Sequence, residues 1–353
     1  MVGAGPAGCA GQADSGPEPP CVLGIDLGTT SVKAALVTGT ERALALAQRD
    51  TRAHTDSREA GPQVAGGQRV GPALPSSHRR LEKSGFPVHL LPEVGDPGSI
   101  AGRTISAWHG IPKGAKVGIA LGDFQCSVYS CLTERTDAVL NISTSAQLTV
   151  SMPPGFQPPD TPDPSSAITY FPYFNGDYLA VAASLNGGNV LAAFVGMVAQ
   201  WTQELGKSSQ GELKSKIELD HQGLEVQESA IYTRIIQAAL AQTHSTLSVH
   251  PTIFGERHTP EQLASVTNIA ASELSLGHVT RALCHGLVQN LCSMLPVQHL
   301  RDVGVRRVLG SGSALARNEV LRQEVERIFP FPVVYGKDVD AAVGAAMVLL
   351  HGK

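Results

Sequence analysis

The feature that most constrains the fold of this chain is a set of three short apolar segments joined by very short connections. These segments lie at residues 21–26, 30–37 and 43–49. Two parallel strands need a crossover of about a dozen residues, whereas two antiparallel strands need only a tight turn. The spacing therefore predicts an antiparallel meander of three strands.

Downstream of this meander, segments with strand periodicity alternate with segments of helical periodicity. Apolar residues recur at helical spacing over 276–295, which predicts one long helix facing the core. The Asn175-Gly176 pair between two apolar runs is typical of a hairpin turn. The mixed order predicts an α/β fold. The further expected elements are a buried strand at 115–123, helices at 124–132, 189–205 and 227–242, hairpins at 137–152 and 170–184, and a strand, a Gly/Ser turn and a helix from 305, followed by a strand and a closing helix.

Three segments lack periodic apolar residues. Residues 1–20 contain GAGPAG, which matches a dinucleotide-binding fingerprint, but no strand precedes it and prolines follow where a helix should begin. We expect a disordered tail there. Residues 50–84 are rich in Arg, Gly, Pro, Ser and His and predict a low-complexity linker. Residues 206–222 predict a polar loop or insertion.

The composition is that of a globular protein, and it limits the expected partners. The chain has 353 residues, 42% hydrophobic and 16% charged, with a net charge of −4. This balance favours neither nucleic acid nor an anionic membrane as a partner, and no apolar run reaches the ~18 residues of a membrane span. The six cysteines form no C-x-x-C pair, so we expect a reduced, cytoplasmic protein. The oligomeric state stays open.

The first candidate site is the turn between the first two predicted strands, which contains Asp26, Gly28, Thr29 and Thr30. Gly28 permits a turn whose backbone N–H groups converge on a phosphate, the threonines add hydroxyl donors, and Lys33 adds a charge. Asp26 could hold Mg²⁺ through water, because hard cations prefer oxygen ligands. An ordinary hairpin with an Asx-type turn is the alternative.

Two further candidates lie where a predicted strand meets a predicted helix. The Gly310-Ser311-Gly312 turn could bring a nucleotide close to the backbone and to a helix N-terminus. Its alternative is a plain connection with Ser313 as the N-cap. Asp123 ends one strand and begins a helix, a position that suits a general base, although a helix N-cap is the alternative.

A fourth candidate is the hydroxyl-rich turn from Asn141 to Ser145, where Ser143 and Thr144 could contact phosphate. Turns rich in Ser and Thr are common, so this signal is weak in isolation. Other reactive residues predict structural roles. Cys284 and His285 lie on the predicted long helix without metal-ligand spacing, and Glu256 lies in a charged loop without an evident partner.

Taken in order, these motifs resemble those of the FGGY carbohydrate kinases, in the actin/hexokinase/Hsp70 ATPase superfamily. The resemblance covers about residues 22–50 and 83–350. It implies an α/β fold of two actin-like (ribonuclease H-like) ATPase domains, 21–135 and 136–353, with ATP and sugar in the cleft between them. The runs that carry it are LGIDLGTTSVKAAL, SGFPVHLLP, LGDFQCSVYS, TDAVLNISTSAQL, SLNGGNVLAAFV, FGERH, SLGHVTRAL, GSGSALARNEVL and DVDAAVGAAM.

The resemblance also implies a reaction and a role for each candidate residue. The reaction would be ATP- and Mg²⁺-dependent phosphorylation of sedoheptulose to sedoheptulose 7-phosphate, feeding the pentose phosphate pathway. Asp123 would take the proton from the sugar hydroxyl, and Asp26 would hold the Mg²⁺. The residues expected to face ATP are Asp26, Gly28, Thr29, Thr30 and Lys33, then Ser143 and Thr144 at the phosphates, and Gly310, Ser311, Gly312, Ser313 and Asn318 at the adenosine.

The first expected domain departs from the family pattern. In the family, most of this domain lies between the third strand and the SGFPVHLLP run, where this chain has the low-complexity residues 50–84. Phe124 and Ser143 also replace a polar residue and a glycine that many relatives carry. The departures leave two alternatives to an active sugar kinase. One is a truncated, catalytically inactive isoform that at most binds nucleotide, and the other is an actin-like ATPase or chaperone without a sugar substrate.

Overall fold

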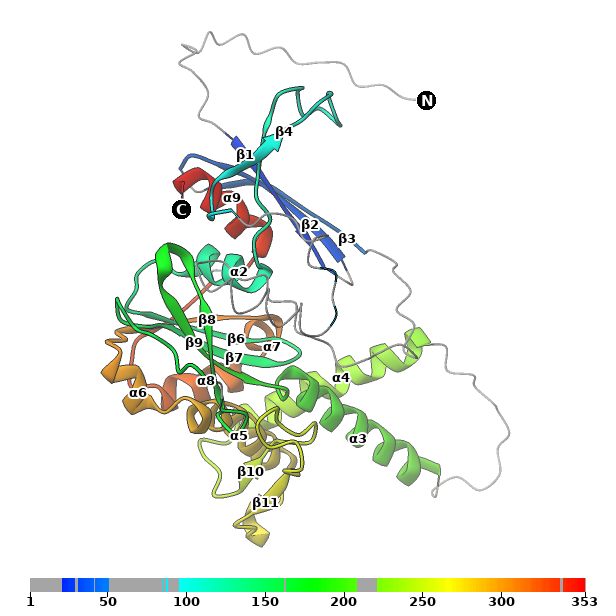
Figure 1. The fold of residues 1–353 in the computed structure, drawn as a ribbon. Helices are drawn as coiled ribbons and strands as arrows, with labels where there is room; N and C mark the ends of the chain where they lie inside the picture. The colour runs from blue at the N-terminus through cyan, green and yellow to red at the C-terminus, as the bar shows by residue number, and fades with distance from the viewer. Residues whose placement is uncertain are drawn as a thin grey trace, which may run out of the picture.

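The computed structural model describes residues 21–28, 31–40, 42–50, 85, 87, 95–161, 163–207, 221–336 and 339–352. The expected tail at 1–20, all but the first residue of the expected linker at 50–84 and most of the expected loop at 206–222 lie outside these residues. Within the described part, two main sheets are separated by helices, and further helices lie beneath the second sheet (Figure 1).

The first sheet is a three-stranded antiparallel meander, which confirms the prediction from the short connections. Its strands are β1 (Cys21–Leu27), β2 (Ser31–Thr38) and β3 (Ala43–Asp50). Successive side chains point to opposite faces of a strand. Ala35 is fully buried on the face that packs against helix α9 (Ala341–His351), whereas Leu23 and Ile25 on the other face are 42% and 43% exposed. The described residues therefore cover this sheet on one face.

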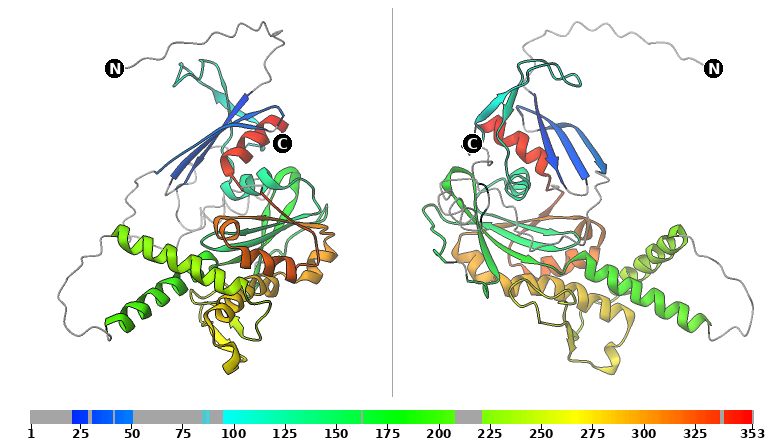
Figure 2. Two further views of the ribbon diagram at one scale, coloured as in Figure 1. Left: turned by 180° about the vertical axis from the view of Figure 1, so that it is seen from behind. Right: turned by 45° about the vertical axis from the view of Figure 1, so that its right-hand side comes forward.

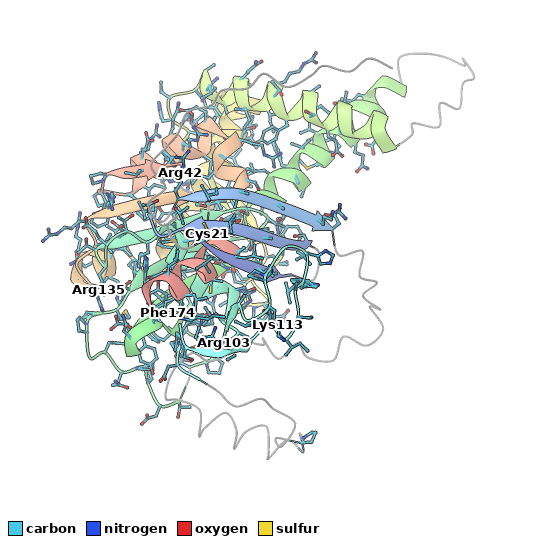
Figure 3. All side chains as sticks on the ribbon, turned by 90° about the horizontal axis from the view of Figure 1, so that it is seen from above. Cys21, Arg42, Arg103, Lys113, Arg135 and Phe174 are labelled. Carbon is cyan, nitrogen blue, oxygen red and sulfur yellow. The ribbon has the colours of Figure 1, made fainter. Side chains whose placement is uncertain are left out.

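Helix α9 lies between the first sheet and helix α2 (Asp123–Cys131), so the C-terminal helix packs on the N-terminal strands (Figures 2 and 3). Two glycines permit this packing. A Cβ on Gly24 would lie 1.8 Å from the Ala342 carbonyl oxygen, and one on Gly344 would lie 1.8 Å from the Cys126 carbonyl oxygen. The expected domain boundary at 136 stays a prediction, but α9, which lies within the expected second domain, packs on the first sheet.

The second sheet has six strands in the order β13-β12-β6-β7-β9-β8. Strand β12 is parallel to β13 and β6, and the other pairs are antiparallel. Both predicted hairpins are confirmed, and the second turns through Asn175 with φ of 60°. The bounds are β6 (Asp137–Ile142), β7 (Ala146–Ser151), β8 (Ile168–Pro172), η3 (Phe174–Gly176), β9 (Tyr178–Ser184), β12 (Arg307–Ser311) and β13 (Val333–Tyr335).

The long helix predicted from leucine spacing is α5 (Leu276–Met294), and it forms the centre of the largest core. Leu283, Leu287 and Leu291 are buried there, whereas Leu276 at its start is 40% exposed. The other predicted helices are also present, and α3 and α4 project from the body as a pair (Figure 2). The remaining elements are α3 (Gly188–Lys207), α4 (His221–Leu240), β10 (Ser248–His250), β11 (Ser265–Thr267), η4 (Ala271–Glu273), α6 (Val297–Asp302), α7 (Ser313–Arg317) and α8 (Glu319–Ile328).

The predicted buried strand at 115–123 is wrong in both length and burial. Only β5 (Lys116–Gly118) is a strand, its first two residues are exposed, and it pairs with β4 (Ile100–Arg103) in a separate two-stranded sheet. A buried strand needs neighbours along its edges and on both faces. The first sheet consists of β1 to β3, and the apolar run at 115–123 pairs with none of these strands.

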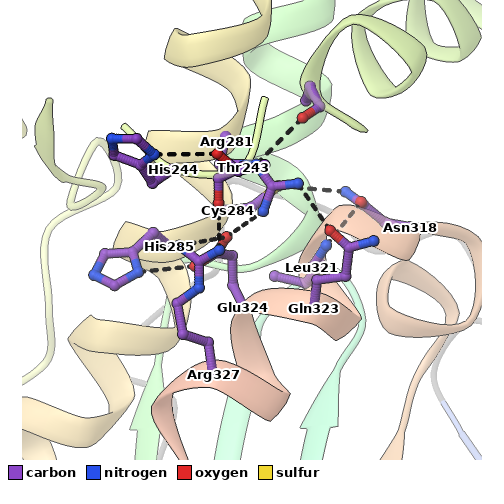
Figure 4. Close-up of polar contacts among 11 residues, drawn as sticks. Thr243, His244, Arg281, Cys284, His285, Asn318, Leu321, Gln323, Glu324 and Arg327 are labelled. Carbon is purple, nitrogen blue, oxygen red and sulfur yellow. Dashed lines mark hydrogen bonds and ion pairs between the residues drawn. The ribbon is translucent and has the colours of Figure 1, made fainter. Parts of the chain in front are cut away.

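A buried ion pair joins α5 to α8. Arg281 Nη1 lies 2.5 Å from Glu324 Oε1, and the two side chains are 3% and 0% exposed. His285 Nδ1 lies 3.0 Å from Glu324 Oε2, and Arg281 donates to the Ala239 carbonyl and the Gln323 amide oxygen (Figure 4). Burial acts to raise the pKa of Glu324, but the hydrogen bonds from His285 and Arg281 and nearby positive charge hold that pKa below its ordinary value.

We expect Gly24→Ala to destabilise the protein by about 1–3 kcal/mol, because the new methyl group would collide with the backbone of α9. Gly102→Ala is the matched control, since Gly102 is also a strand glycine but has open space at its Cβ position. Urea unfolding followed by circular dichroism measures both variants. Equal stability of the two would contradict the close packing of α9 on β1.

We expect Glu324→Gln to lower the free energy of unfolding by about 3–5 kcal/mol at pH 7, because it leaves Arg281 buried without its counter-ion. A carboxyl group with a lowered folded-state pKa stabilises the fold above its unfolded pKa and loses this effect as pH falls. The difference between wild type and variant should therefore shrink in acid. The exposed Glu319→Gln on the same helix is the control, with an expected loss below about 1 kcal/mol.

Candidate functional site

Predicted site residues from both sheets line one cavity of about 340 Å³. Lys33 comes from β2, Asp123 from the start of α2, and Ser143 from the turn after β6. The cavity therefore joins residues that are distant in the sequence and belong to different sheets. Its lining is Lys33, Asp123, Phe124, Ser127, Val128, Val139, Asn141, Ser143, Gln147, Thr149 and Val339.

Asp26 and Lys33 are paired in register on β1 and β2, beside this cavity. The pKa of Asp26 is raised by burial of its carboxyl group, which outweighs the opposing effect of Lys33. The negative charges of Asp123 and Asp340 raise the same pKa further. Three carboxyl groups and one lysine thus interact electrostatically here, and a bound cation would relieve the repulsion among the carboxylates.

The turn between β1 and β2 is closed by a hydrogen bond from the Gly28 N–H to the Ser31 carbonyl oxygen, at 3.0 Å. A Cβ on Gly28 would lie 2.8 Å from that oxygen, so the tight turn favours glycine. The hairpin predicted for this segment is confirmed. Thr29 and Thr30 lie outside the described residues, so their contacts with a phosphate stay predictions.

Asp123 is the exposed first residue of α2, and its Oδ1 accepts a 2.7 Å hydrogen bond from the Phe124 N–H. The alternative of Asp123 as the N-cap is wrong, because Gly122 occupies that position and no side chain caps the helix. Asp123 lies in the lining of the cavity, and its role as a general base stays a prediction.

The Ser143 hydroxyl connects the two strands that flank the site. It donates to Asn141 Oδ1 at 3.1 Å, and it accepts a 3.3 Å hydrogen bond from the Ser313 N–H. Thr144 is exposed at the tip of the same turn, and its carbonyl oxygen accepts from the Asn189 N–H at 3.0 Å. The hydroxyl-rich turn after β6 is thus hydrogen-bonded to the Gly/Ser turn after β12.

A second cavity, of about 280 Å³, lies at this Gly/Ser turn. Gly310, Ser311 and Gly312 line one part of it, and Arg322 and Tyr335 line another. The Arg322 guanidinium carbon lies 5.5 Å from the centre of the Tyr335 ring. Gly312 has φ of 105°, and a Cβ there would meet backbone and side-chain oxygens after 2.4 Å or less. The remaining lining residues are Leu315, Ala316 and Gly336.

Two residues predicted to contact the nucleotide lie at helix starts beside this second cavity. The Asn318 side chain is fully buried, and its Oδ1 accepts from the Leu321 N–H at 3.0 Å as the N-cap of α8. Ser313 is the first residue of α7, and the N-cap is Gly312, so the predicted Ser313 cap is wrong. Any direct contact of these residues with a nucleotide stays a prediction.

The sequence interpretation missed three polar residues of the first cavity. Gln147 and Thr149 alternate along β7, and Ser127 lies one turn after Asp123 on α2. The signal that could have found the first two is the polar residue at every second position after the 143–145 turn, since alternate residues share one face of a strand. Ser127 carries no such signal.

The described residues contain no group of three or more His, Cys, Asp or Glu side chains placed to hold a metal ion. The carboxyl groups around Asp26 therefore do not form a complete protein cage for a cation. Mg²⁺ commonly keeps several waters and binds through one or two carboxylates together with substrate phosphates. The residues present fit that kind of site. Across the described helices, none is long and apolar enough to span a membrane.

Comparison with known sequences shows close relatives over most of the chain. The human protein named sedoheptulokinase is 62% identical over 271 residues, which are 77% of this chain and 53% of the relative. The mouse protein of that name is 63% identical over 271 residues, with the same coverage. The chain thus spans about half the length of these curated relatives. The search of protein-family models gave no match.

Comparison with solved structures shows the fold. The crystal structure of a xylulose kinase from Rhodospirillum rubrum matches with a TM-score of 0.67, over 94% of this chain and 90% of that chain, at 15% identity. Identity at this level shows a shared fold alone. Together with the sequence relatives, it confirms the predicted resemblance to carbohydrate kinases and the predicted α/β fold.

We expect Asp26→Asn to stabilise the fold at pH 7 and to lose this advantage in acid. A carboxyl group with a raised folded-state pKa costs stability above that pKa, and the cost disappears below its unfolded pKa, where both states are protonated. Thermal unfolding of wild type and variant at several pH values measures the difference. Asp160→Asn is the exposed control, and an equal change in both variants would contradict the electrostatic strain at Asp26.

Proposed function

We propose that this chain, a member of the FGGY carbohydrate kinase family, transfers the terminal phosphoryl group of ATP to sedoheptulose, giving sedoheptulose 7-phosphate. One observation carries the proposal. Asp123, Lys33 and Ser143 share one cavity, and the Ser143 hydroxyl accepts from the N–H of Ser313, the residue that follows the Gly310–Gly312 turn of the second cavity. The identity to proteins named sedoheptulokinase supports the choice of sugar.

In this proposal Asp123 is the general base. Its carboxylate accepts the proton from the attacking sugar hydroxyl, while Phe124 and Gln147 in the same lining contact the sugar. Phosphoryl transfer has a loose transition state, so positioning and charge neutralisation supply most of the catalysis. An ordinary carboxylate suffices, because the hydroxyl proton leaves late in the reaction.

The phosphate groups lie beside Lys33 and Ser143, which line the first cavity from the first and the second sheet. Thr29 and Thr30 lie outside the described residues, and their contact with the phosphates, like that of Gly28, is part of the proposal. Asp26 would hold Mg²⁺ through water, and the charge of the metal would relieve the carboxylate repulsion at this position. The metal neutralises phosphate charge when bound.

The adenosine occupies the second cavity, which Gly310, Gly312 and Tyr335 line. Gly310 lets the Tyr335 ring pack against the backbone there, since a Cβ on Gly310 would lie 2.6 Å from that ring. The Arg322 guanidinium lies over the Tyr335 ring and adds a planar positive group to the lining of this cavity. Asn318 acts through the α8 cap, which fixes the wall of the cavity.

A second candidate function is nucleotide binding without sugar phosphorylation. The outer face of the first sheet favours it, because Leu23 and Ile25 are more than two-fifths exposed and Leu27 is 79% exposed. The chain also spans about half the length of its curated relatives. A small sheet packed on one face buries less apolar surface than a fully covered one, so the cleft has less support on this side.

The proposed place of action is the cytoplasm, in the pentose phosphate pathway. The thiols of Cys126, Cys284 and Cys292 are buried, which raises the pKa of each to about 12. Such thiols stay protonated at neutral pH and react slowly with oxidants or disulfides. This chemistry is compatible with a reducing compartment.

We expect Asp123→Asn to lower the rate of sedoheptulose-dependent ADP release by about 10²–10⁴-fold, because the amide cannot accept the hydroxyl proton. ATP binding, measured by calorimetry, should change little. Asp160→Asn is the control with an exposed carboxylate away from the cavity. Turnover near the wild-type rate in Asp123→Asn would contradict the role of the base.

A second measurement separates the two candidate functions. The chain is compared with a version that carries the complete first domain of its human relative, and both are assayed for ATP binding and sugar phosphorylation. An active kinase gives comparable turnover in both proteins. The inactive alternative gives ATP binding in both but phosphorylation only in the longer one.

A further inference from the structure

A buried acidic residue, Glu256, lies outside both cavities. Glu256 was expected in a charged loop without a partner, but its side chain is 1% exposed and surrounded by donors. Its Oε1 accepts from Ser184 Oγ at 2.5 Å, Asn186 Nδ2 at 2.9 Å and Asn290 Nδ2 at 2.8 Å. Its Oε2 accepts from the Leu185 N–H at 3.1 Å. Four hydrogen bonds thus satisfy a carboxylate that the fold removes from water.

Three of these four donors belong to one continuous segment, Ser184–Asn186, which leaves the end of β9. The loop that carries Glu256 holds Asn186 at two further points. Asn186 Nδ2 donates to the Gly255 carbonyl oxygen at 2.8 Å, and Asn186 Oδ1 accepts from the Phe254 N–H at 3.2 Å. Hydrogen bonds therefore hold both the backbone and the side chains of the segment after β9.

The next two residues, Gly187 and Gly188, pack closely against the turn at 143–145. The Gly188 N–H donates to the Ser143 carbonyl oxygen at 2.7 Å. A Cβ on Gly187 would lie 2.5 Å from the Ser145 carbonyl carbon, and one on Gly188 would lie 2.6 Å from the Ser143 carbonyl oxygen. Contact this close transmits a displacement of the segment directly to the turn.

We propose that Glu256 is a positioning residue that sets the Ser143–Ser145 turn for phosphoryl transfer through the Ser184–Gly188 segment. This inference rests on the proposed kinase function for its catalytic consequence, but not for its structural part. Glu256 lines neither cavity and acts through the segment alone. Its effect on catalysis passes through Ser143, which lines the first cavity and whose hydroxyl accepts from the Ser313 N–H.

The positioning depends on the two acceptor oxygens of Glu256 and not on its volume. In Glu256→Gln the shape is kept, but one oxygen becomes an NH₂ group that faces donors and cannot accept from them. A buried donor left without an acceptor destabilises the fold, because it has lost its contact with water and gained no partner. The variant therefore loses either the hydrogen bond from the Leu185 N–H or those from the side chains of Ser184, Asn186 and Asn290. The volume of the buried side chain is unchanged, so no cavity forms.

Amide hydrogen exchange of the ligand-free chain tests the structural part. In Glu256→Gln we expect the amides of Gly188 and Asn189, which donate to the turn, to exchange about tenfold faster or more. The amides of Leu287 in α5 and Leu309 in β12 should keep their wild-type rates. Glu261→Gln, an exposed residue of the same loop, is the matched control and should change none of these rates.

The functional part is read from kinetics with ATP and sedoheptulose. A displaced phosphate-facing turn should raise KM for ATP and lower kcat, with KM for the sugar nearly unchanged. Calorimetric binding of ADP to wild type and variant runs in parallel. If wild type binds no nucleotide and phosphorylates no sugar, the proposed function fails, while the exchange result still decides whether Glu256 fixes the turn.

Two outcomes would overturn the inference. One is wild-type exchange at Gly188 and Asn189 in a folded Glu256→Gln variant. The other is faster exchange spread equally over α5 and β12, which is the mark of a residue that only stabilises the domain. Should Glu256→Gln fail to fold, Ser184→Ala removes a single donor and is expected to give the same local pattern with a smaller increase in rate.

Discussion

The architecture depends on the close packing of α9 between the first sheet and α2. Gly24 and Gly344 let backbone meet backbone at distances that any side chain would prevent. This contact brings the last helix of the chain to the first strands, and it places the start of α2, with Asp123, beside the β1–β2 hairpin. Lys33 and Asp123 can share a cavity only because this docking holds.

Hydrogen bonds to buried polar groups then define the cleft side of the second sheet. The Ser143 hydroxyl ties the end of β6 to the start of α7, and Asn318 caps α8. Glu256 holds the segment that presses on the same turn. Asn318 and Glu256 are buried, and an unpaired donor or acceptor is costly at a buried position. Their geometry is therefore well determined, which suits a site that must present donors at fixed positions.

Most elements of the fold could be predicted from the sequence because their signals are local. The antiparallel meander follows from short connections, and α5 follows from leucines at helical spacing. The strand expected at 115–123 was wrong because burial depends on neighbours that the apolar run does not encode. Of the candidate site, the predicted Lys33, Asp123 and Ser143 do line one cavity, whereas Gln147 and Thr149 were missed because their role depends on which face of β7 borders it.

The sequence by itself determined the motifs, their order and the resemblance to carbohydrate kinases, since each motif is a short run of residue types. The tertiary structure alone decided which motifs meet. It placed α9 on the first sheet, identified Gly122 and not Asp123 as the N-cap of α2, and gave Glu256 four donors from β9, its following segment and α5. The physical reason is that burial and hydrogen-bond partners are properties of residues distant in sequence, which only the packed chain brings within reach.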